Sequence, residues 1–259
     1  MPVSFAAKTD PGKVRTNNED SYTVDVNLGL FMVADGMGGH DAGEVAAAMA
    51  IFQTHRYIAA GVSLTDSLSK THQDILQAGG KNRHSMGSTG VALHHLGDQY
   101  EVGWVGDSRA YRYTFGTGQN LLERLTQDHS FVQTLIDQGS ITEEEARVHP
   151  QRNVITQCLG NRSQEQVKVG KTAGIWRPNQ WLLLCSDGLT GELDDQAISQ
   201  ILSSCNGSEN AVELLVQAAI AKGGNDNITV IIVESPKQPS WIDSFRQKLL
   251  SLLPKLTPA

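Results

Sequence analysis

The sequence predicts an α+β protein in which antiparallel β-sheets are covered by helices. Segments of strand length outnumber the strand-helix alternations that a doubly wound parallel sheet would contain. Several of these segments follow one another across short turns, at Gly97-Asp98 and around Gly106-Asp107. Short turns of this kind join antiparallel strands, because parallel strands need a long crossover connection. We therefore expect antiparallel sheets with helices outside them.

Six segments rich in apolar residues predict the main strands. They are 28–34, 90–94, 100–105, 110–115, 181–186 and 228–233. Capping residues and helix-stopping glycines and prolines predict the helices between them. The expected helices are 41–57, 63–80, 130–139, 142–149, 194–204 and 208–222. The second of these is expected to stop at Gly79-Gly80.

Composition and charge exclude several classes of protein. The chain has 259 residues, of which 39% are hydrophobic, as in an ordinary soluble globular protein. Its net charge of -7 argues against nucleic acid as the main ligand, because binding the phosphate backbone requires a basic patch. The three cysteines lack C-x-x-C spacing, so a reducing cytoplasm fits best. We find no signal peptide and no run of the roughly 18 apolar residues that a transmembrane helix needs.

Acidic residues stand beside the predicted strands. Asp35-Gly36 and Asp187-Gly188 each follow an apolar strand, and Asp20, Asp128 and Asp226 also lie next to strand-like segments. One such Asp-Gly pair alone is most simply a turn. Five acids gathered at strand ends would repel one another without cations, and hard divalent cations prefer carboxylate oxygens. The pattern therefore favours a cation site.

Six short motifs occur along the chain in a fixed order. They are Arg15-x-x-Asn18-Glu19-Asp20, Asp35-Gly36-Met37-Gly38-Gly39-His40, Gly106-Asp107-Ser108-Arg109-Ala110-Tyr111, Leu125-Thr126-Gln127-Asp128-His129-Ser130, Ser186-Asp187-Gly188-Leu189 and Gly224-Asn225-Asp226-Asn227-Ile228-Thr229. In this order they resemble the metal-dependent protein phosphatases, the type 2C or PPM serine/threonine phosphatases, and especially their bacterial branch. The resemblance extends over residues 4–234. Each motif alone is a weak signal, but six in order are specific.

The resemblance implies a four-layer α-β-β-α architecture. A central sandwich of two antiparallel sheets would be flanked by helices on both sides. The catalytic domain would span residues 1–235, with a small helical flap near the metal site at about 129–160. An ordinary helical insertion is the alternative to a flap. The amphipathic tail at 236–259 is expected to dock on the body as a helix, rather than bind a membrane surface or a partner.

The resemblance also implies the site residues. Two core Mg²⁺ or Mn²⁺ ions and a third, weaker one would be bound. Asp35, the Gly36 carbonyl, Asp187 and Asp226 would be direct ligands, and Asp20 and Glu19 would act mostly through coordinated water. Asp128 would help to hold the third ion. Asp107 would support the ligands rather than bind metal directly.

The implied reaction is hydrolysis of phosphoserine and phosphothreonine esters by a metal-activated bridging water, without a covalent phosphoenzyme. None of the cysteines lies in the loop that a cysteine phosphatase requires. Arg15 would bind the phosphate, because a guanidinium can bind two phosphate oxygens at once. Met37 stands where many eukaryotic relatives have a histidine, so His40 is assigned as the leaving-group acid or a substrate contact. His129 is adjacent to Asp128 and could belong to the site, but it could equally be a structural histidine.

The implied partners are phosphorylated proteins, including a Ser/Thr kinase or another signalling protein, acted on by a cytoplasmic monomer. One alternative is a catalytically silent regulator that binds phosphoproteins with the same fold. It is disfavoured because Arg15 and the core acids are present. A two-metal phosphodiesterase or nuclease is disfavoured by the acidic balance and by the lack of a basic or aromatic strand-binding segment. A purely structural protein would not need so many acids at strand ends.

Overall fold

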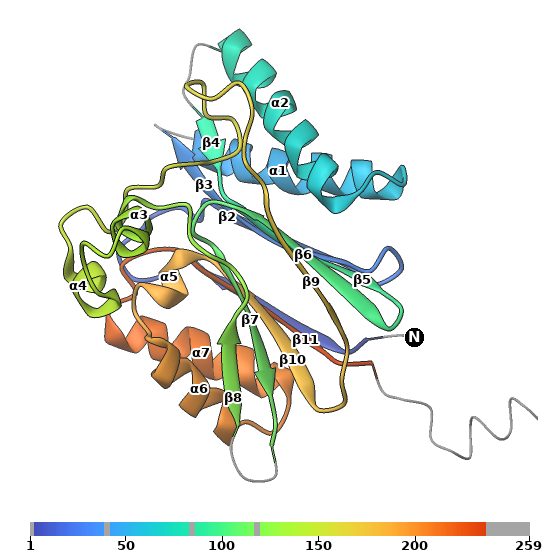
Figure 1. Ribbon diagram of the computed structural model, residues 1–259, viewed down its shortest axis with the longest axis vertical. Coiled ribbons are helices and arrows are strands. Elements are labelled where there is room, and N and C mark those ends of the chain that lie inside the picture. The colour runs from blue at the N-terminus through green and yellow to red at the C-terminus, as the bar shows by residue number, and fades with distance from the viewer. Residues whose placement is uncertain (1–2, 39–41, 83–85, 117–119, 237–259) are drawn as a thin grey trace, which may run out of the picture.

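The computed structural model describes residues 3–38, 42–82, 86–116 and 120–236. Two sheets face each other, and helices cover the outer face of each (Figure 1). Every strand pair in the described residues is antiparallel. The predicted α+β sandwich with flanking helices is therefore confirmed.

The five-stranded sheet holds the first and last strands of the described chain side by side. Its order is β1 (Phe5–Asp10), β11 (Ile228–Glu234), β10 (Gln180–Cys185), β7 (Arg109–Thr114) and β8 (Leu121–Arg124). In β10, Leu182 and Leu184 pack into the space between the sheets, whereas Leu183 and Cys185 pack against the helices. Successive side chains of a strand point to opposite faces, so a strand covered on both faces is apolar at every position.

The six-stranded sheet forms the second layer. Its order is β2 (Asp20–Asp25), β3 (Leu30–Gly38), β5 (Gly90–Leu96), β6 (Gln99–Val105) and β9 (Gly170–Ile175), and β4 (Met86–Ser88) pairs with the end of β3. Phe31 and Val33 of β3 face the other sheet, and Leu30 and Met32 face the helices. The same alternation therefore builds both outer layers.

Two pairs of long helices form the outer layers. The helices α1 (Ala42–Ala59) and α2 (Leu64–Asn82) cover the six-stranded sheet, and α6 (Asp195–Ser204) and α7 (Ser208–Lys222) cover the five-stranded one (Figure 1). The short helices α3 (Phe131–Asp137), α4 (Glu143–Val148) and α5 (Asp187–Thr190) lie together beside one end of the sandwich (Figure 1). Ser130 and Thr142 cap α3 and α4, as their sequence patterns predicted.

Two predicted boundaries are wrong. The strand expected to end before Asp35 continues to Gly38, because β4 supplies a new antiparallel partner for its last residues. Asp35 therefore lies within β3, where its backbone carbonyl accepts a hydrogen bond from Thr89 N at 2.8 Å. The helix expected to stop at Gly79-Gly80 continues to Asn82. Glycine lowers helix stability by about 1 kcal/mol but ends a helix only when it turns left-handed, which Gly80 does not.

Candidate functional site

Acidic side chains from both sheets meet at one end of the sandwich. Asp20 and Asp35 are directly opposite each other across the β2–β3 pair. Asp187 follows β10, and Asp226 precedes the neighbouring strand β11. Sequence positions far apart are thus brought together, because Asp20 and Asp35 lie in paired strands of one sheet while Asp187 and Asp226 flank paired strands of the other.

Burial and the charges of neighbouring carboxylates raise the pKa values of Asp35, Asp107 and Asp187. Burial is the largest cause that raises the pKa of Asp35, and the charges of Asp187, Asp20 and Asp107 raise it further. Burial also raises the pKa of Asp187 and of Asp107. The charge of Asp226 adds to the effect on Asp187. A cluster of this kind favours either protons or cations as neutralising partners.

Asp20 is a buried member of the cluster. Its Oδ2 accepts hydrogen bonds from Ser186 Oγ and Thr229 Oγ1, both at 2.7 Å. Burial nevertheless raises its pKa to about 7. Its Oδ1 is buried and has no hydrogen-bond partner in the part of the chain that the structure describes. A buried carboxylate oxygen without a donor is costly, and a cation or its coordinated water would satisfy it.

Arg15 reaches the same cluster from the loop before β2. Its Nη2 donates to Asp226 Oδ2 at 2.8 Å. The charge of Asp226 is the main cause that raises the pKa of Arg15, with smaller contributions from Glu19 and Asp35. The Arg15 side chain is 51% exposed, so an incoming anion can reach the guanidinium. Sequence reasoning placed Arg15 near the acids, but it did not anticipate the direct ion pair.

Asn227 holds the Arg15 loop in place, and sequence reasoning missed this role. Its Nδ2 donates to the carbonyls of Pro11 at 3.1 Å and Asn17 at 2.9 Å. Its Oδ1 accepts from Glu19 N at 2.8 Å. The residue is buried, and one amide side chain therefore connects β11 to both ends of the loop. Its place inside the motif that contains Asp226 was the only available signal.

The glycines that follow Asp35 and Asp187 allow close backbone packing. A Cβ on Gly36 would overlap the Gly43 carbonyl and lie 2.7 Å from the Glu19 carbonyl oxygen. A Cβ on Gly188 would overlap the Asn227 carbonyl oxygen and lie 2.9 Å from its carbonyl carbon. Neither glycine has a positive φ. Their lack of a side chain therefore lets neighbouring segments of the chain approach each other.

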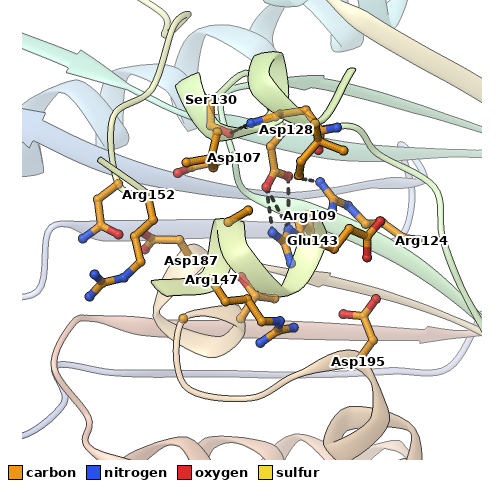
Figure 2. A pocket seen from close by; sticks show the side chains of 17 residues that line it. Asp107, Arg109, Arg124, Asp128, Ser130, Glu143, Arg147, Arg152, Asp187 and Asp195 are labelled. Carbon is orange, nitrogen blue, oxygen red and sulfur yellow. Dashed lines mark hydrogen bonds and ion pairs between the residues drawn. The ribbon is translucent and has the colours of Figure 1, made fainter. Parts of the chain in front are cut away.

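Asp128 is engaged by two arginines (Figure 2). Arg109 Nε donates to both carboxylate oxygens at 3.1 Å, and Arg109 Nη2 donates to Oδ2 at 2.7 Å. Arg124 Nη2 donates to Oδ1 as well. A carboxylate offers about four acceptor positions, so these bonds leave little capacity for a cation. The role of Asp128 at a third ion stays a prediction, and it would require an arginine to move.

The two histidine assignments have different outcomes. His40 lies outside the described residues, so its role remains a prediction. His129 Nδ1 accepts a hydrogen bond from Gly106 N at 3.2 Å, and its ring stacks on Trp104. Burial lowers its pKa, which favours the neutral ring that can accept this bond. These contacts support the structural alternative for His129.

Divalent cations fit the chemistry of this cluster. The described residues contain no set of three acidic, histidine or cysteine side chains that already encloses one ion. Asp35 and Asp187 share a side-chain hydrogen bond, and Asp226 pairs with Arg15. The donors are hard oxygens, and one of them, Asp20 Oδ1, is buried without a partner. Asp20, Asp35, Asp187 and Asp226 are the residues that would hold the ions.

The raised pKa values predict how pH affects the metal-free protein. Between about pH 4 and pH 7 Asp20 keeps its proton in the folded state but loses it in the unfolded state, so its contribution to stability should fall as pH rises. We expect a loss on the order of a few kcal/mol between about pH 4 and pH 7. Thermal unfolding without metal measures this loss. Added Mn²⁺ should raise the melting temperature more at pH 8 than at pH 5, and a metal-free protein that becomes more stable toward pH 8 would contradict the expectation.

The family model described as Protein phosphatase 2C matches residues 13–222. The serine/threonine protein phosphatase PstP of Mycobacterium tuberculosis is 36% identical over 250 residues, which cover 90% of this chain and 45% of PstP. The chain therefore spans about half the length of PstP. The serine/threonine phosphatase stp of Listeria monocytogenes is 33% identical, with 88% of this chain and 94% of stp covered.

Solved structures agree with these matches. A crystal structure of Mycobacterium tuberculosis PstP superposes with a TM-score of 0.80 at 34% identity, covering 91% of this chain and 99% of that one. Stp1 from Staphylococcus aureus superposes with a TM-score of 0.82 at 31% identity, covering 91% and 96%. A PstP catalytic domain in complex with 2 manganese ions superposes with a TM-score of 0.77 at 31% identity, covering 90% and 98%.

Proposed function

This chain belongs to the protein phosphatase 2C family, and from that premise we propose that it hydrolyses phosphoserine and phosphothreonine esters in proteins. The observation that carries the proposal is the convergence of Asp20, Asp35, Asp187 and Asp226 beside Arg15. Such a cluster can hold cations and, through the guanidinium, a phosphate. The resemblance that the motifs predicted is confirmed by the family match.

Mg²⁺ or Mn²⁺ is the cofactor that these residues would hold. We assign two core ions to Asp35, the Gly36 carbonyl, Asp187 and Asp226, with Asp20 and Glu19 acting through water. When bound, such ions supply a water of lowered pKa and neutralise the charge that develops on the phosphoryl group. Burial, which raises the carboxyl pKa values in the free protein, then strengthens the attraction of the ionised carboxylates for the ions.

Arg15 would bind and orient the phosphate. Its half-exposed guanidinium lies at the edge of the carboxylate cluster, where the ion pair with Asp226 keeps it in position. A phosphate oxygen can exchange for Asp226 as its partner, and a second oxygen can take another N–H of the fork. Arg15 therefore holds the ester beside the acids without itself forming a covalent bond.

Cys158 and Cys185 do not supply a nucleophile. Cys158 and Cys185 are buried, and burial raises the pKa of Cys158 to about 11 and that of Cys185 to about 12. At neutral pH both remain thiols, which are poor nucleophiles. This supports direct attack by water, without a covalent phosphoenzyme.

Several finer assignments belong to the proposal. We assign residues 1–235 to the catalytic domain and residues 129–160 to a flap that selects substrates. We propose that the protein acts in the cytoplasm. We further propose a monomer whose substrates include a phosphorylated kinase or signalling protein. The tail expected at 236–259 lies almost entirely outside the described residues. In the described chain, no helix combines the length and apolar character that crossing a bilayer requires.

The proposal is tested by hydrolysis of p-nitrophenyl phosphate and of a phosphothreonine peptide, each with and without Mn²⁺. We expect turnover of both substrates with metal, and its loss on chelation. Binding of the phosphopeptide without turnover under any divalent metal would instead support the silent-regulator alternative.

Replacing Arg15 with Ala is expected to raise KM for a phosphopeptide by about tenfold to a hundredfold, with a smaller change in kcat. A charge-assisted hydrogen bond contributes about 1.5–3 kcal/mol, and here it acts on the phosphate already in the bound ground state. Steady-state kinetics of Arg15→Ala and Arg15→Lys measure the effect. Lys13→Ala, which removes an exposed cation from the same loop, is the control, and an unchanged KM in Arg15→Ala would exclude Arg15 as the phosphate ligand.

A further inference from the structure

A second charged pocket adjoins the carboxylate cluster. It has a volume of about 150 Å³ and lies between α3, α4 and α5, with Asp107 and Asp187 in its wall (Figure 2). Asp187 therefore borders both the carboxylate cluster and this pocket. Whatever occupies the pocket would lie next to the group being hydrolysed.

Four arginines line this pocket, and they fall into two classes. Arg109 and Arg124 are committed to Asp128. Arg147, in the last turn of α4, and Arg152, in the turn that follows, are exposed. In the part of the chain that the structure describes, neither the Arg147 nor the Arg152 side chain forms a hydrogen bond or an ion pair, although Arg147 interacts electrostatically with the exposed Glu144. Two guanidinium groups are thus available to an external anion.

The acids of the pocket do not neutralise these two arginines. Asp195 accepts a hydrogen bond from Tyr111 Oη at 3.0 Å. Glu143 lies one turn before Arg147 on α4, yet the two form no ion pair in the described structure. Figure 2 shows Arg152 on the Asp187 side of the pocket, whereas Glu143 and Asp195 lie toward its opposite side. An anion that approaches from the cluster would therefore meet Arg152 first.

We propose that Arg147 and Arg152 bind an anionic group of the substrate that lies within a few residues of the phosphoserine or phosphothreonine being hydrolysed. That group is an Asp or Glu carboxylate or a second phosphate, both of which match the planar fork of a guanidinium. The inference rests on the proposed phosphatase function and deepens it, because it names acidic or multiply phosphorylated segments as the preferred substrates.

The expected size of the preference follows from the exposure of the two side chains. A fully exposed ion pair contributes little, about 0.2–1 kcal/mol. Two guanidiniums acting on one anion inside a pocket should contribute more, and we expect about a tenfold preference in kcat/KM. Because the extra contact is made by substrate already bound, most of this preference should appear in KM.

The test compares phosphothreonine peptides that differ at one flanking position, scanned over the three residues on each side. The flank is Gln, Glu, Lys or a non-hydrolysable phosphonate analogue of phosphoserine. The wild-type enzyme should prefer the Glu or phosphonate peptide to the Gln peptide by about tenfold at its best position. A preference confined to Glu identifies a carboxylate as the ligand, and one confined to the phosphonate identifies a second phosphate.

Arginine variants decide whether these two side chains carry the preference. The ratio between the anionic and Gln peptides should fall to about one in Arg147→Ala/Arg152→Ala, and Arg152→Glu should shift the preference toward the Lys peptide. Arg177→Ala removes an exposed arginine outside the pocket and should leave the ratio at its wild-type value. A wild-type ratio of one at every position, or an unchanged ratio in the double variant, would overturn the inference.

Failure of the inference can be distinguished from failure of the proposed function. Absence of p-nitrophenyl phosphate hydrolysis in the wild-type protein with Mn²⁺ counts against the phosphatase function but not against anion binding by Arg147 and Arg152. Fluorescence anisotropy of the same labelled peptides would then still report whether Arg147 and Arg152 bind the anionic flank. Tighter binding of the anionic peptide that disappears in the double variant supports the pocket, and equal binding of all peptides overturns it.

Discussion

Replacing Asp187 with Asn is expected to lower kcat/KM by about 10³-fold or more, equivalent to about 4 kcal/mol of transition-state stabilisation. The amide keeps the shape of the side chain but cannot supply the negative charge that holds a divalent cation. Without metal the folded protein should be as stable as wild type or slightly more stable, because burial opposes ionisation of Asp187. Activity assays with Mn²⁺ and thermal unfolding without it measure the two opposite effects.

A second readout separates loss of the cation from loss of the fold. The rise in melting temperature that Mn²⁺ produces should shrink or disappear in Asp187→Asn. Asp98→Asn makes the same chemical change at an exposed turn between β5 and β6 and should behave as wild type. Substantial activity and a full Mn²⁺-dependent shift in Asp187→Asn would show that this carboxylate holds no metal.

Replacing Gly188 with Ala is expected to destabilise the protein by about 3 kcal/mol or more, and to lower its melting temperature by roughly 6–12 °C. The added methyl group would overlap the Asn227 carbonyl, which is backbone and cannot rotate away. Displacing Asn227 would also disturb its bonds to the loop that carries Arg15 and Glu19. Urea or thermal unfolding, together with the activity of the folded protein, measures both consequences.

Gly80→Ala is the matched control for this substitution. Gly80 lies within α2, has no positive φ, and has open space where the Cβ would stand. Alanine there should leave stability unchanged or raise it by up to about 1 kcal/mol, because alanine is the better helix former. Wild-type stability in Gly188→Ala would show that α5 and the residues just before β11 can separate without cost.

The long apolar elements could be predicted from the sequence, whereas the short or polar ones could not. The strands β10 and β11 are buried over nearly their whole length, so most of their residues are apolar. In contrast, β9 contains two glycines and alternates between exposed and half-buried residues, a pattern that a loop also shows. The helix α5 has only four residues, and its tertiary contacts define it more than its propensity does.

The members of the acidic cluster could be predicted because several motifs in order identified the family. The hydrogen-bond partners of these residues could not be predicted from the sequence. The pairing of Asp128 with Arg109, and the support of the Arg15 loop by Asn227, each join residues whose separation in sequence gives no periodic signal. Arg124 and Asp128 are four residues apart, but this spacing predicts a contact only within a helix, and neither residue lies in one. Only the register of the strands and the packing of the loops determine such contacts.

Because β1 pairs with β11, the first and last strands of the folded body could be joined and the chain opened elsewhere without changing the strand pairing. Glu234 N donates to Ser4 O at 2.8 Å, so the two ends of the folded body are adjacent. A short linker could join them, and new ends could be opened at the exposed turn of Gly97 and Asp98. Such a circular permutant would keep every carboxylate beside its present neighbours, because their proximity depends on interstrand pairing and not on the covalent path between them.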